Sequence, residues 1–557
     1  MRQPLWPACA LANLCLLTAG RAEHDPAAAE LWVALRELQI VECEGTAIAP
    51  DGVELATDVI LNRSCGEVLQ VVSLPSDRRW MCADAQHMFV RKCWEELFGI
   101  VVQQMSRGVR GNGVVITGNP GIGKSWFLNY AMLRLARDAE HKHRAVVYES
   151  VAHGLIWTFE RGGVVRKMDW RRRTSLKLLD ESSTVYLFDP AGNTGETREP
   201  QRCDAFTVVT ASPNPTHYKD FKKHSKVPGI TPQTFYMAPW SLLELQAAAP
   251  YVGHTFGELE MSEVESRFER FGGVARVVLA DSVEEHENDL EAAIHSCDVD
   301  EVLKAVNKAD AANSVTHKIL QYDVIDDSLR RVQARFASDY VARRCCDDML
   351  RSQQDRMLRF LGDALSRPGL GNLPGTMFER WMHTLLVGGG KFNMRRLEPG
   401  AHGPGSARAL GEGELTTVDV PVLEHHLFHT LSETQDMGGC HAYFEPDHSN
   451  FAVLDALIRC EGGCGPLSPH IGLQATTTLE HPIAMARLKE HLEHLGEPPS
   501  FDLVFVVPQN IFGEFRYQKY HTTGNRLATS IDKAMSKVKQ WVLELPVRDD
   551  RRGRWRR

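Results

Sequence analysis

The segment from Gly118 to Ser125 constrains the fold of this 557-residue chain more than any other. Its eight residues fit the pattern G-x-x-x-x-G-K-S, with an apolar run before them and a helical pattern after them. In such a unit, backbone N–H groups wrap phosphate oxygens at a helix N-terminus. The residues expected to bind a nucleotide are Gly118, Asn119, Pro120, Gly121, Ile122, Gly123, Lys124 and Ser125.

Two side chains of this loop have distinct chemical roles. Lys124 is expected to contact the outer phosphates, and the Ser125 hydroxyl is expected to ligate Mg²⁺. The motif therefore predicts ATP and Mg²⁺ as cofactors.

Short apolar runs alternate with helical patterns around and after this loop. The runs are Val114–Thr117, Ala145–Glu149, Thr184–Phe188, Phe206–Thr210 and Thr234–Met237. Nearly continuous apolar strands separated by helices indicate a parallel sheet that is covered on both faces. We therefore expect an α/β fold with a P-loop NTPase sheet, a helical lid or connector, and a smaller α/β domain after it.

A carboxylate for the metal is expected on the strand that neighbours the phosphate loop. The strand Val185–Phe188 ends in Asp189, which fits this role; the alternative is a plain turn opened by Asp-Pro. Pro190 stands where many hydrolysing proteins of this class carry a water-polarising Glu, so we expect slow turnover or another water-holding group. Ser212 and Asn214 follow the next strand and are candidate sensors of the outer phosphate, with an ordinary loop as the alternative.

Composition limits the other classes of function. The formal net charge is −9, which excludes a uniformly basic surface, so any site for a polyanion must be local. No apolar run reaches the roughly 18 residues of a membrane span, and we expect no stable membrane association. The 13 Cys do not form the dense framework of a disulfide scaffold, which favours reduced thiols.

The first 22 residues have the layout of a secretory signal peptide. Arg2 precedes an apolar stretch, and small residues follow at Thr18, Ala19, Gly20 and Ala22. The alternative is an ordinary N-terminal extension.

The region around the phosphate loop resembles a known family. The string from Val115 to Tyr130 is similar to the P-loop domain of the Crinkler effectors of oomycete-type pathogens and of the related retrotransposon hot spot proteins. Further segments agree in order: 147–150, 186–190, 211–214, 268–276 and 336–341. The resemblance covers about residues 85 to 345. It implies that Arg276, after a Gly-Gly pair, senses nucleotide from the lid; a surface arginine is the alternative.

In these families a restriction-endonuclease-like domain often follows the ATPase, with a helix carrying Glu, a strand carrying Asp and a strand carrying Glu-x-Lys. The matching residues here are Glu379 at a helix start, Asp455 in an apolar strand over 450–456, and Gln474 on the next strand. By this resemblance Glu379 and Asp455 hold Mg²⁺, as Ser125 and Asp189 do in the first site.

Two positions depart from the family pattern. Gln474 stands where a second carboxylate is expected, and Thr476 stands where the lysine is expected. An active nuclease, a nucleic-acid-binding relic and an unrelated fold all remain open.

Two smaller features have ordinary alternatives. Cys440, His441, Cys460, Cys464 and His470 can be drawn as a zinc site, but their irregular spacing favours loop thiols. The Arg-rich end of the chain suits a phosphate-binding or nuclear-targeting tail, or simply a solvated end.

The resemblance and the patterns together predict a domain order. It is a signal-like stretch at 1–22, a header-like region at 23–95, a P-loop NTPase domain at 96–280, a helical lid or connector at 281–375, a restriction-endonuclease-like domain at 376–546, and a basic tail at 547–557.

Two functions follow from this order. The leading expectation is an ATP-binding and ATP-hydrolysing Crinkler-like effector whose P-loop module controls a Mg²⁺-dependent DNA endonuclease-like module. The alternative is a non-catalytic, ATP-gated protein that binds host or nuclear proteins. The expected location is the host nucleus after secretion, or the nucleus of the producing cell without secretion.

Overall fold

The structure is a computed structural model of the chain. It describes residues 23–37, 59–61, 68–74, 78–83, 85–109, 112–161, 163–190, 198–213, 217–223, 231–252, 259–307, 316–365, 373–399, 414–447, 451, 453–522, 526–528 and 530–547. The signal-like stretch at 1–22, the candidate sensor Asn214 and the Arg-rich tail from 548 onward lie outside the described residues.

The chain divides into two compact units. The first consists of Met1–Val264, Val274–Asp281 and Val324–Val332. The second consists of Glu265–Gly273, Ser282–Asp323 and Gln333–Arg557. Each unit is described by itself.

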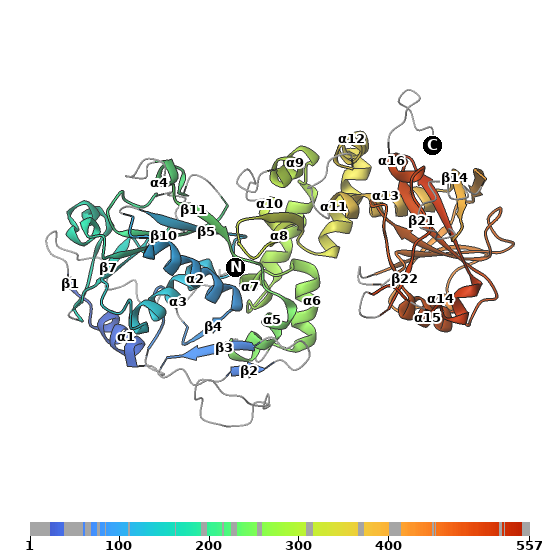
Figure 1. Ribbon diagram of the computed structural model, residues 1–557. Helices are drawn as coiled ribbons and strands as arrows, with labels where there is room; N and C mark the ends of the chain where they lie inside the picture. Colours follow the sequence, from blue (N-terminus) through green and yellow to red (C-terminus); the bar gives the residue numbers. More distant parts are fainter. Residues whose placement is uncertain are drawn as a thin grey trace, which may run out of the picture. The chain divides into compact units, whose positions relative to one another are not determined.

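The first unit is built on an eight-stranded sheet (Figure 1). In sheet order its strands are β1 (Glu23–His24), β8 (Val165–Asp169), β7 (Leu155–Phe159), β6 (Val146–Ser150), β9 (Val185–Asp189), β10 (Phe206–Ala211), β5 (Gly113–Thr117) and β11 (Gln233–Tyr236). The strands β6, β9, β10, β5 and β11 run parallel, and they are the ones that the apolar runs predict. The predicted α/β class is therefore confirmed.

Three further strands extend the sheet beyond β6, and the apolar pattern does not indicate them. β7, β8 and β1 each pair antiparallel with their neighbour. The β8 sequence is Val-Arg-Lys-Met-Asp, and only Val165 in it is fully buried. Strand pairing near a sheet edge tolerates such polar sequences, so periodicity alone does not reveal them.

Helices cover one face of this sheet. α2 (Lys92–Ser106) packs on β5, and α3 (Lys124–Arg137) packs on β10. The apolar spacing over Arg91–Met105 predicts an amphipathic helix, and α2 confirms it. The opposite face is a core of Val115, Val147, Tyr186, Phe188 and Val209. Leu179 and Tyr218 pack on that core.

Smaller elements complete the first unit. α1 (Pro26–Glu37) packs on α3. The strands β2 (Val59–Leu61), β3 (Val68–Ser73) and β4 (His87–Val90) form an antiparallel sheet. The apolar run Val68–Leu74 predicts a strand, and β3 confirms it.

The second unit contains a mixed eight-stranded sheet (Figure 1). In sheet order its strands are β15 (Thr416–Val420), β14 (Gly390–Leu397), β23 (Val538–Leu545), β21 (Phe501–Pro508), β19 (His470–Ala475), β18 (Ala456–Cys460), β17 (His441–Pro446) and β16 (Glu424–Phe428). β17, β18 and β19 form an antiparallel meander. The chain then passes through α15 (Met485–His494) into β21, which runs parallel to β19.

Two details of the sequence prediction are wrong in this unit. α13 (Leu373–Val387) begins five residues before Phe378, so Glu379 lies inside the helix rather than at its start. β18 begins at Ala456, so Asp455 immediately precedes the strand rather than lying within it. Both errors concern element ends, where fraying and caps rather than periodicity set the boundary.

Helices α8 (Glu284–His295), α9 (Val299–Asn307), α11 (Asp339–Ser352) and α12 (Gln354–Ala364) confirm the helical character expected after residue 281. The spacing of Leu329, Val332, Phe336 and Tyr340 also predicts helical turns. This holds for Tyr340, which lies in α11, and is wrong for the other three. Residues Leu320–Val324 (β12) and Val332–Phe336 (β13) form a two-stranded sheet instead. Ala334 and Phe336 are buried at alternate positions of β13, which is the period of a strand.

Among the helices in the described ranges, none combines the length and the apolar character needed to cross a bilayer.

β5 and β10 approach each other closely at Gly113. A Cβ at Gly113 would lie 2.1 Å from the carbonyl oxygen of Thr207 on β10. We expect Gly113→Ala to lower the unfolding free energy by about 3 kcal/mol, because backbone on two paired strands cannot move apart cheaply. Calorimetric melting checks this.

Gly99→Ala is the matched control. Gly99 lies on the exposed side of α2 with no atom within 4 Å of an added Cβ. This variant should gain about 0.5–1 kcal/mol from helix propensity. Equal melting temperatures for the two variants would contradict the close approach of the strands.

Candidate functional site

The loop between β5 and α3 requires glycine at two positions. Gly118 has φ 151° and Gly121 has φ 81°. A Cβ on Gly118 would lie 2.7 Å from the carbonyl oxygen of Met237, and one on Gly121 would lie 2.9 Å from Cγ1 of Val274. The loop backbone is therefore held against its neighbours, at two positions where only glycine fits without strain.

Lys124 is buried at the start of α3, with 9% of its surface exposed. Its Nζ donates to the carbonyl oxygens of Gly118 at 2.8 Å and Asn119 at 2.6 Å. Burial, together with the positive charge of Arg276, lowers the pKa of Lys124 to about 7, and Asp189 partly opposes this shift. Phosphate oxygens are better partners for an ammonium than carbonyl oxygens, so this lysine suits an anionic ligand.

Asp189 lies buried at the carboxyl end of β9. The expectation that its strand neighbours β5 is wrong, because β10 lies between β9 and β5. The carboxyl ends of these parallel strands still meet at one edge, and the charge of Asp189 acts on Lys124. Ser212, half-buried, directly follows β10 at this edge.

Arg276 lies in α7 (Ala275–Val278), beside the loop. Its backbone N–H donates to the carbonyl oxygen of Gly121 at 3.1 Å, and a Cβ on Gly121 would lie 3.0 Å from that of Arg276. The guanidinium is exposed and close enough to Lys124 to lower its pKa. The structure thus brings together the phosphate loop, Asp189 and Arg276.

A polar brace that the motif does not reveal holds the loop from behind. Trp240 Nε1 donates to the carbonyl oxygen of Ile122 at 2.9 Å. The guanidinium of Arg91, 2% exposed, stacks on the Trp240 ring at 4.7 Å and bonds both carboxylate oxygens of Glu244 at 2.8 and 3.0 Å. Glu244 also closes a capping box with Ser241. Only the Ser-x-x-Glu pattern is visible in the sequence.

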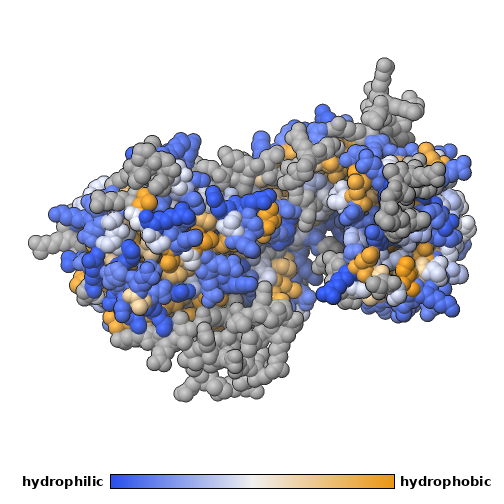
Figure 2. Space-filling model, viewed as in Figure 1, coloured by the Kyte–Doolittle hydropathy of each residue, from blue (hydrophilic) through white to orange (hydrophobic). Residues whose placement is uncertain are grey.

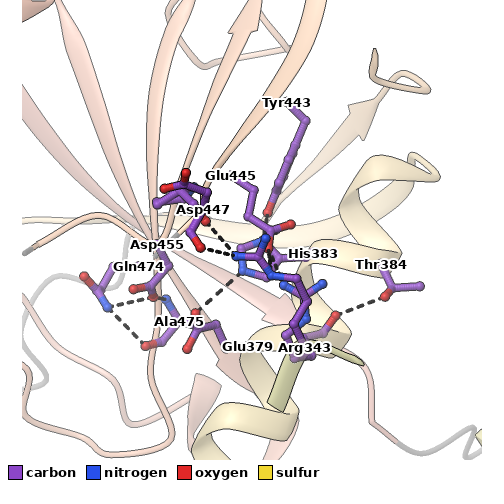
Figure 3. Close-up of polar contacts among 12 residues, drawn as sticks. Arg343, Glu379, His383, Thr384, Tyr443, Glu445, Asp447, Asp455, Gln474 and Ala475 are labelled. Atoms are coloured by element: carbon purple, nitrogen blue, oxygen red, sulfur yellow. Dashed lines mark hydrogen bonds and ion pairs between the residues drawn. The ribbon is translucent and has the colours of Figure 1, made fainter. Parts of the chain in front are cut away.

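In the second unit, Asp455 lies between α13 and the end of β19 (Figure 3). Its Oδ2 accepts hydrogen bonds from Gln474 Nε2 at 2.7 Å and from the Ala475 N–H at 2.6 Å. Burial and the nearby charge of Glu379 raise the pKa of Asp455 well above its ordinary value, while these two hydrogen bonds oppose the shift. The structure therefore brings Glu379, Asp455 and Gln474 together.

The backbone before Asp455 is strained. Val453 has φ 79°, a left-handed conformation that a β-branched residue rarely adopts. Such strain costs about 1–3 kcal/mol and occurs mostly where the surrounding structure must place a functional group.

The donor set fits Mg²⁺ with restrictions. Two carboxylates are hard ligands, and Mg²⁺ keeps several waters at such sites. The Gln474 amide turns its nitrogen toward Asp455, so it supports that carboxylate and supplies no oxygen to the pair. Among the residues that the structure describes, no three His, Cys, Asp or Glu side chains form a metal-binding group. Thr476 stands where the family carries lysine, and its neutral side chain supplies no positive charge there. The hydroxyl is buried and forms a hydrogen bond with that of Thr478.

Beside this pair lies a buried carboxylate, Glu445 on β17, 2% exposed. It contacts Arg380 Nη1, Arg343 Nε at 3.4 Å and His425 Nε2 at 2.9 Å. Burial alone would raise the pKa of Glu445, but the His425 hydrogen bond and the positive charges of its neighbours hold it well below its ordinary value. No sequence motif points to this cluster.

The cysteines and histidines considered for zinc lie at one end of the meander. His441 Nδ1 lies 3.1 Å from Cys460 Sγ, and these two residues face each other across β17 and β18. Burial and the neighbouring Cys460 raise the pKa of the Cys464 thiol to about 12. Within the described ranges, these residues do not form a group of three that could hold one metal ion.

Comparison with known proteins supports the Crinkler part of the resemblance. The chain is 27% identical over 356 residues to Crinkler effector protein 15 of Phytophthora infestans, and 26% identical over 355 residues to Crinkler effector protein 16. Each match covers 63% of this chain and 53% of the relative, so the match spans about half the length of these relatives. No family model matches the chain.

Solved structures give only distant matches. The alignment with the Thermotoga maritima RuvB branch migration motor covers 53% of this chain and 88% of the RuvB chain, at 13% identity and a TM-score of 0.23. The Saccharomyces cerevisiae Hsp104–ADP complex covers 52% and 51%, at 15% identity and a TM-score of 0.25. No conclusion is drawn from matches this weak.

The lowered pKa of Lys124 predicts proton uptake on nucleotide binding. At pH 8 a lysine with a pKa of about 7 is mostly neutral, and phosphate oxygens should restore its charge. We expect binding of ATP to take up close to one proton (~0.9) at pH 8, by linkage. Calorimetry in two buffers of different ionisation enthalpy measures this.

Lys124→Arg is the matched control, since a guanidinium stays charged at every accessible pH. It should bind ATP with a heat that does not depend on the buffer. A buffer-independent heat for the unmodified protein would contradict the prediction.

Proposed function

We propose that the first unit binds ATP with Mg²⁺ and hydrolyses it slowly. The observation that carries this proposal is the buried Lys124 ammonium, which is bonded to loop carbonyls at 2.6 and 2.8 Å with Asp189 at the same sheet edge. On binding, Lys124 exchanges these carbonyls for phosphate oxygens, and the loop N–H groups donate to the same phosphates.

Ser125 and Asp189 hold Mg²⁺, which neutralises charge on the outer phosphates. Arg276 contacts the nucleotide from α7, since its backbone already bonds Gly121. Pro190, next to Asp189, has no polar side-chain atom to orient water, and this supports slow turnover. Ser212 at the end of β10 is the remaining candidate for the outer phosphate, with Asn214 beyond it.

We further propose that the second unit is a Mg²⁺-dependent, endonuclease-like module that acts on DNA and is controlled by the nucleotide state of the first. Support comes from the convergence of Glu379, Asp455 and Gln474: Gln474 donates to Asp455 at 2.7 Å, and burial together with the charge of Glu379 raises the pKa of Asp455. When bound there, Mg²⁺ would orient water and stabilise the leaving oxygen. Glu379 and Asp455 are its ligands.

A non-catalytic binding module is the second candidate. The neutral Gln474 and the absence of a lysine at Thr476 favour it, because the site then carries less negative charge for metal and no cation beside the attacking water. In that case the second unit binds DNA or host nuclear proteins without cutting.

Two relatives are named Crinkler effector proteins of Phytophthora infestans. We propose that this chain is an effector that is secreted and acts in the host nucleus. We also propose that the chain is related to the retrotransposon hot spot proteins and that its domains follow the order predicted from the sequence.

The nucleotide site is tested by Lys124→Ala. Nucleotide at a hundredfold excess over its Kd should stabilise the unmodified protein by about 2.7 kcal/mol. The variant should lose most of the ATP-induced rise in melting temperature because the outer phosphates lose their cation. Lys177→Ala, an exposed lysine of the same unit, should keep the rise. An unchanged rise in Lys124→Ala would overturn the assignment.

The nuclease proposal is tested with plasmid DNA and Mg²⁺ or Mn²⁺. We expect nicking that Asp455→Ala abolishes and that Gln474→Glu increases several-fold, because a third anionic ligand strengthens metal binding. Asp419→Ala removes an exposed carboxylate of the same unit and should leave nicking unchanged. Cleavage that is absent, or independent of Asp455, under both metals would leave the binding module as the better description.

A further inference from the structure

His383 lies on α13 one turn after Glu379 and is 3% exposed. Its Nδ1 lies 2.7 Å from the hydroxyl of Tyr443, whose side chain is fully buried. The two rings also meet edge to face, at 5.8 Å and 89°. Packing and a hydrogen bond together leave the His383 ring a single orientation.

In that orientation the second ring nitrogen faces Glu379. Residues four apart share one face of a helix, and His383 Nε2 lies 3.7 Å from Glu379 Oε1. The distance is that of an ion pair, which can shorten to a hydrogen bond when the carboxylate turns. Figure 3 shows His383 between Glu379 and Tyr443, with Asp455 on the far side of Glu379.

A carboxylate like Glu379 needs such support. Its side chain is 35% exposed, and ordering a glutamate costs up to about 2 kcal/mol of rotamer entropy. Asp455, by contrast, is already fixed by two hydrogen bonds from β19. Of the two proposed metal ligands, Glu379 is therefore the one that lacks a backbone hydrogen bond from β19 and is positioned by the His383 side chain instead.

The neighbourhood of His383 explains why it stays in place. Glu445 Oε2 lies 4.0 Å from His383 Nδ1, and Arg343, Arg380 and His425 surround that carboxylate. Moving the imidazole would disturb this buried cluster as well as the Tyr443 hydrogen bond.

We propose that His383 is a positioning residue, held by Tyr443, that fixes the Glu379 carboxylate toward Asp455 and so sets the divalent-metal affinity of the pair. This inference rests on the metal site proposed for the second unit. Partners that orient a ligand from behind typically contribute 10–100-fold to metal affinity.

The test measures Mn²⁺ binding to the full chain without nucleotide or DNA, by electron paramagnetic resonance of free Mn²⁺. Tyr443→Phe removes only the hydroxyl, and His383→Leu removes both nitrogens at similar bulk. Each should weaken binding at the Asp455-dependent site by 10-fold or more, and His383→Gln, which keeps a donor, should recover part of the loss. Because recovery by a donor reports orientation of Glu379, a role in folding alone does not produce it.

Tyr340→Phe is the matched control. It likewise removes only a tyrosine hydroxyl, one that donates to Glu291 rather than contacting His383, and it lies away from the pair. Its Mn²⁺ affinity should equal that of the unmodified protein, and melting curves should show all variants folded at the assay temperature. If Tyr443→Phe does not fold, the His383→Leu and His383→Gln pair decides.

Two negative results are distinguishable. If Asp455→Ala leaves Mn²⁺ binding unchanged, the metal site itself is wrong and the role of His383 falls with it. If Asp455→Ala weakens binding while Tyr443→Phe and His383→Leu bind as tightly as the unmodified protein, the metal site stands and His383 does not position Glu379.

Discussion

The need to compensate buried charge organises both units. Glu445 is 2% exposed, and it is surrounded by Arg343 and Arg380 from two helices and by His425 from an edge strand. Removing one member of such a cluster usually costs about 3–5 kcal/mol because the remaining charges stay buried without partners. In the first unit Arg91 and Glu244 meet the same requirement behind the phosphate loop. The polar interior of each unit is thus also the support of its candidate site.

The fold was predictable where short-range pattern and burial agree. β5, β9 and β10 are buried at every position, so each appears in the sequence as a continuous apolar run. α2 is buried along one face, so its apolar residues recur at the helical period. The phosphate loop was predictable because its backbone approaches its neighbours so closely that few residues other than glycine fit. By contrast, β8 is polar and near an edge, and β12 and β13 alternate too briefly to outweigh the helical patterns on either side.

The order of strands and the partners of the sites could not be read from the chain. Asp189 lies one strand farther from the loop than expected because β10 inserts between β9 and β5, a long-range choice without a local signal. Trp240 contacts the phosphate loop from a segment far away in sequence. His383 and Tyr443 lie behind Glu379 and do not themselves match any motif. A single buried histidine has the same sequence appearance whether it supports a ligand or merely fills a core.

Pro190 bears on how long a bound nucleotide would last before hydrolysis. On the proposed function, a nucleotide site without a polar side chain at this position releases phosphate rarely, so one bound nucleotide outlasts many encounters of the second unit with its partners. Hydrolysis then ends one long nucleotide-bound period, as in a timed switch. It does not drive the rapid repeated cycles of a motor.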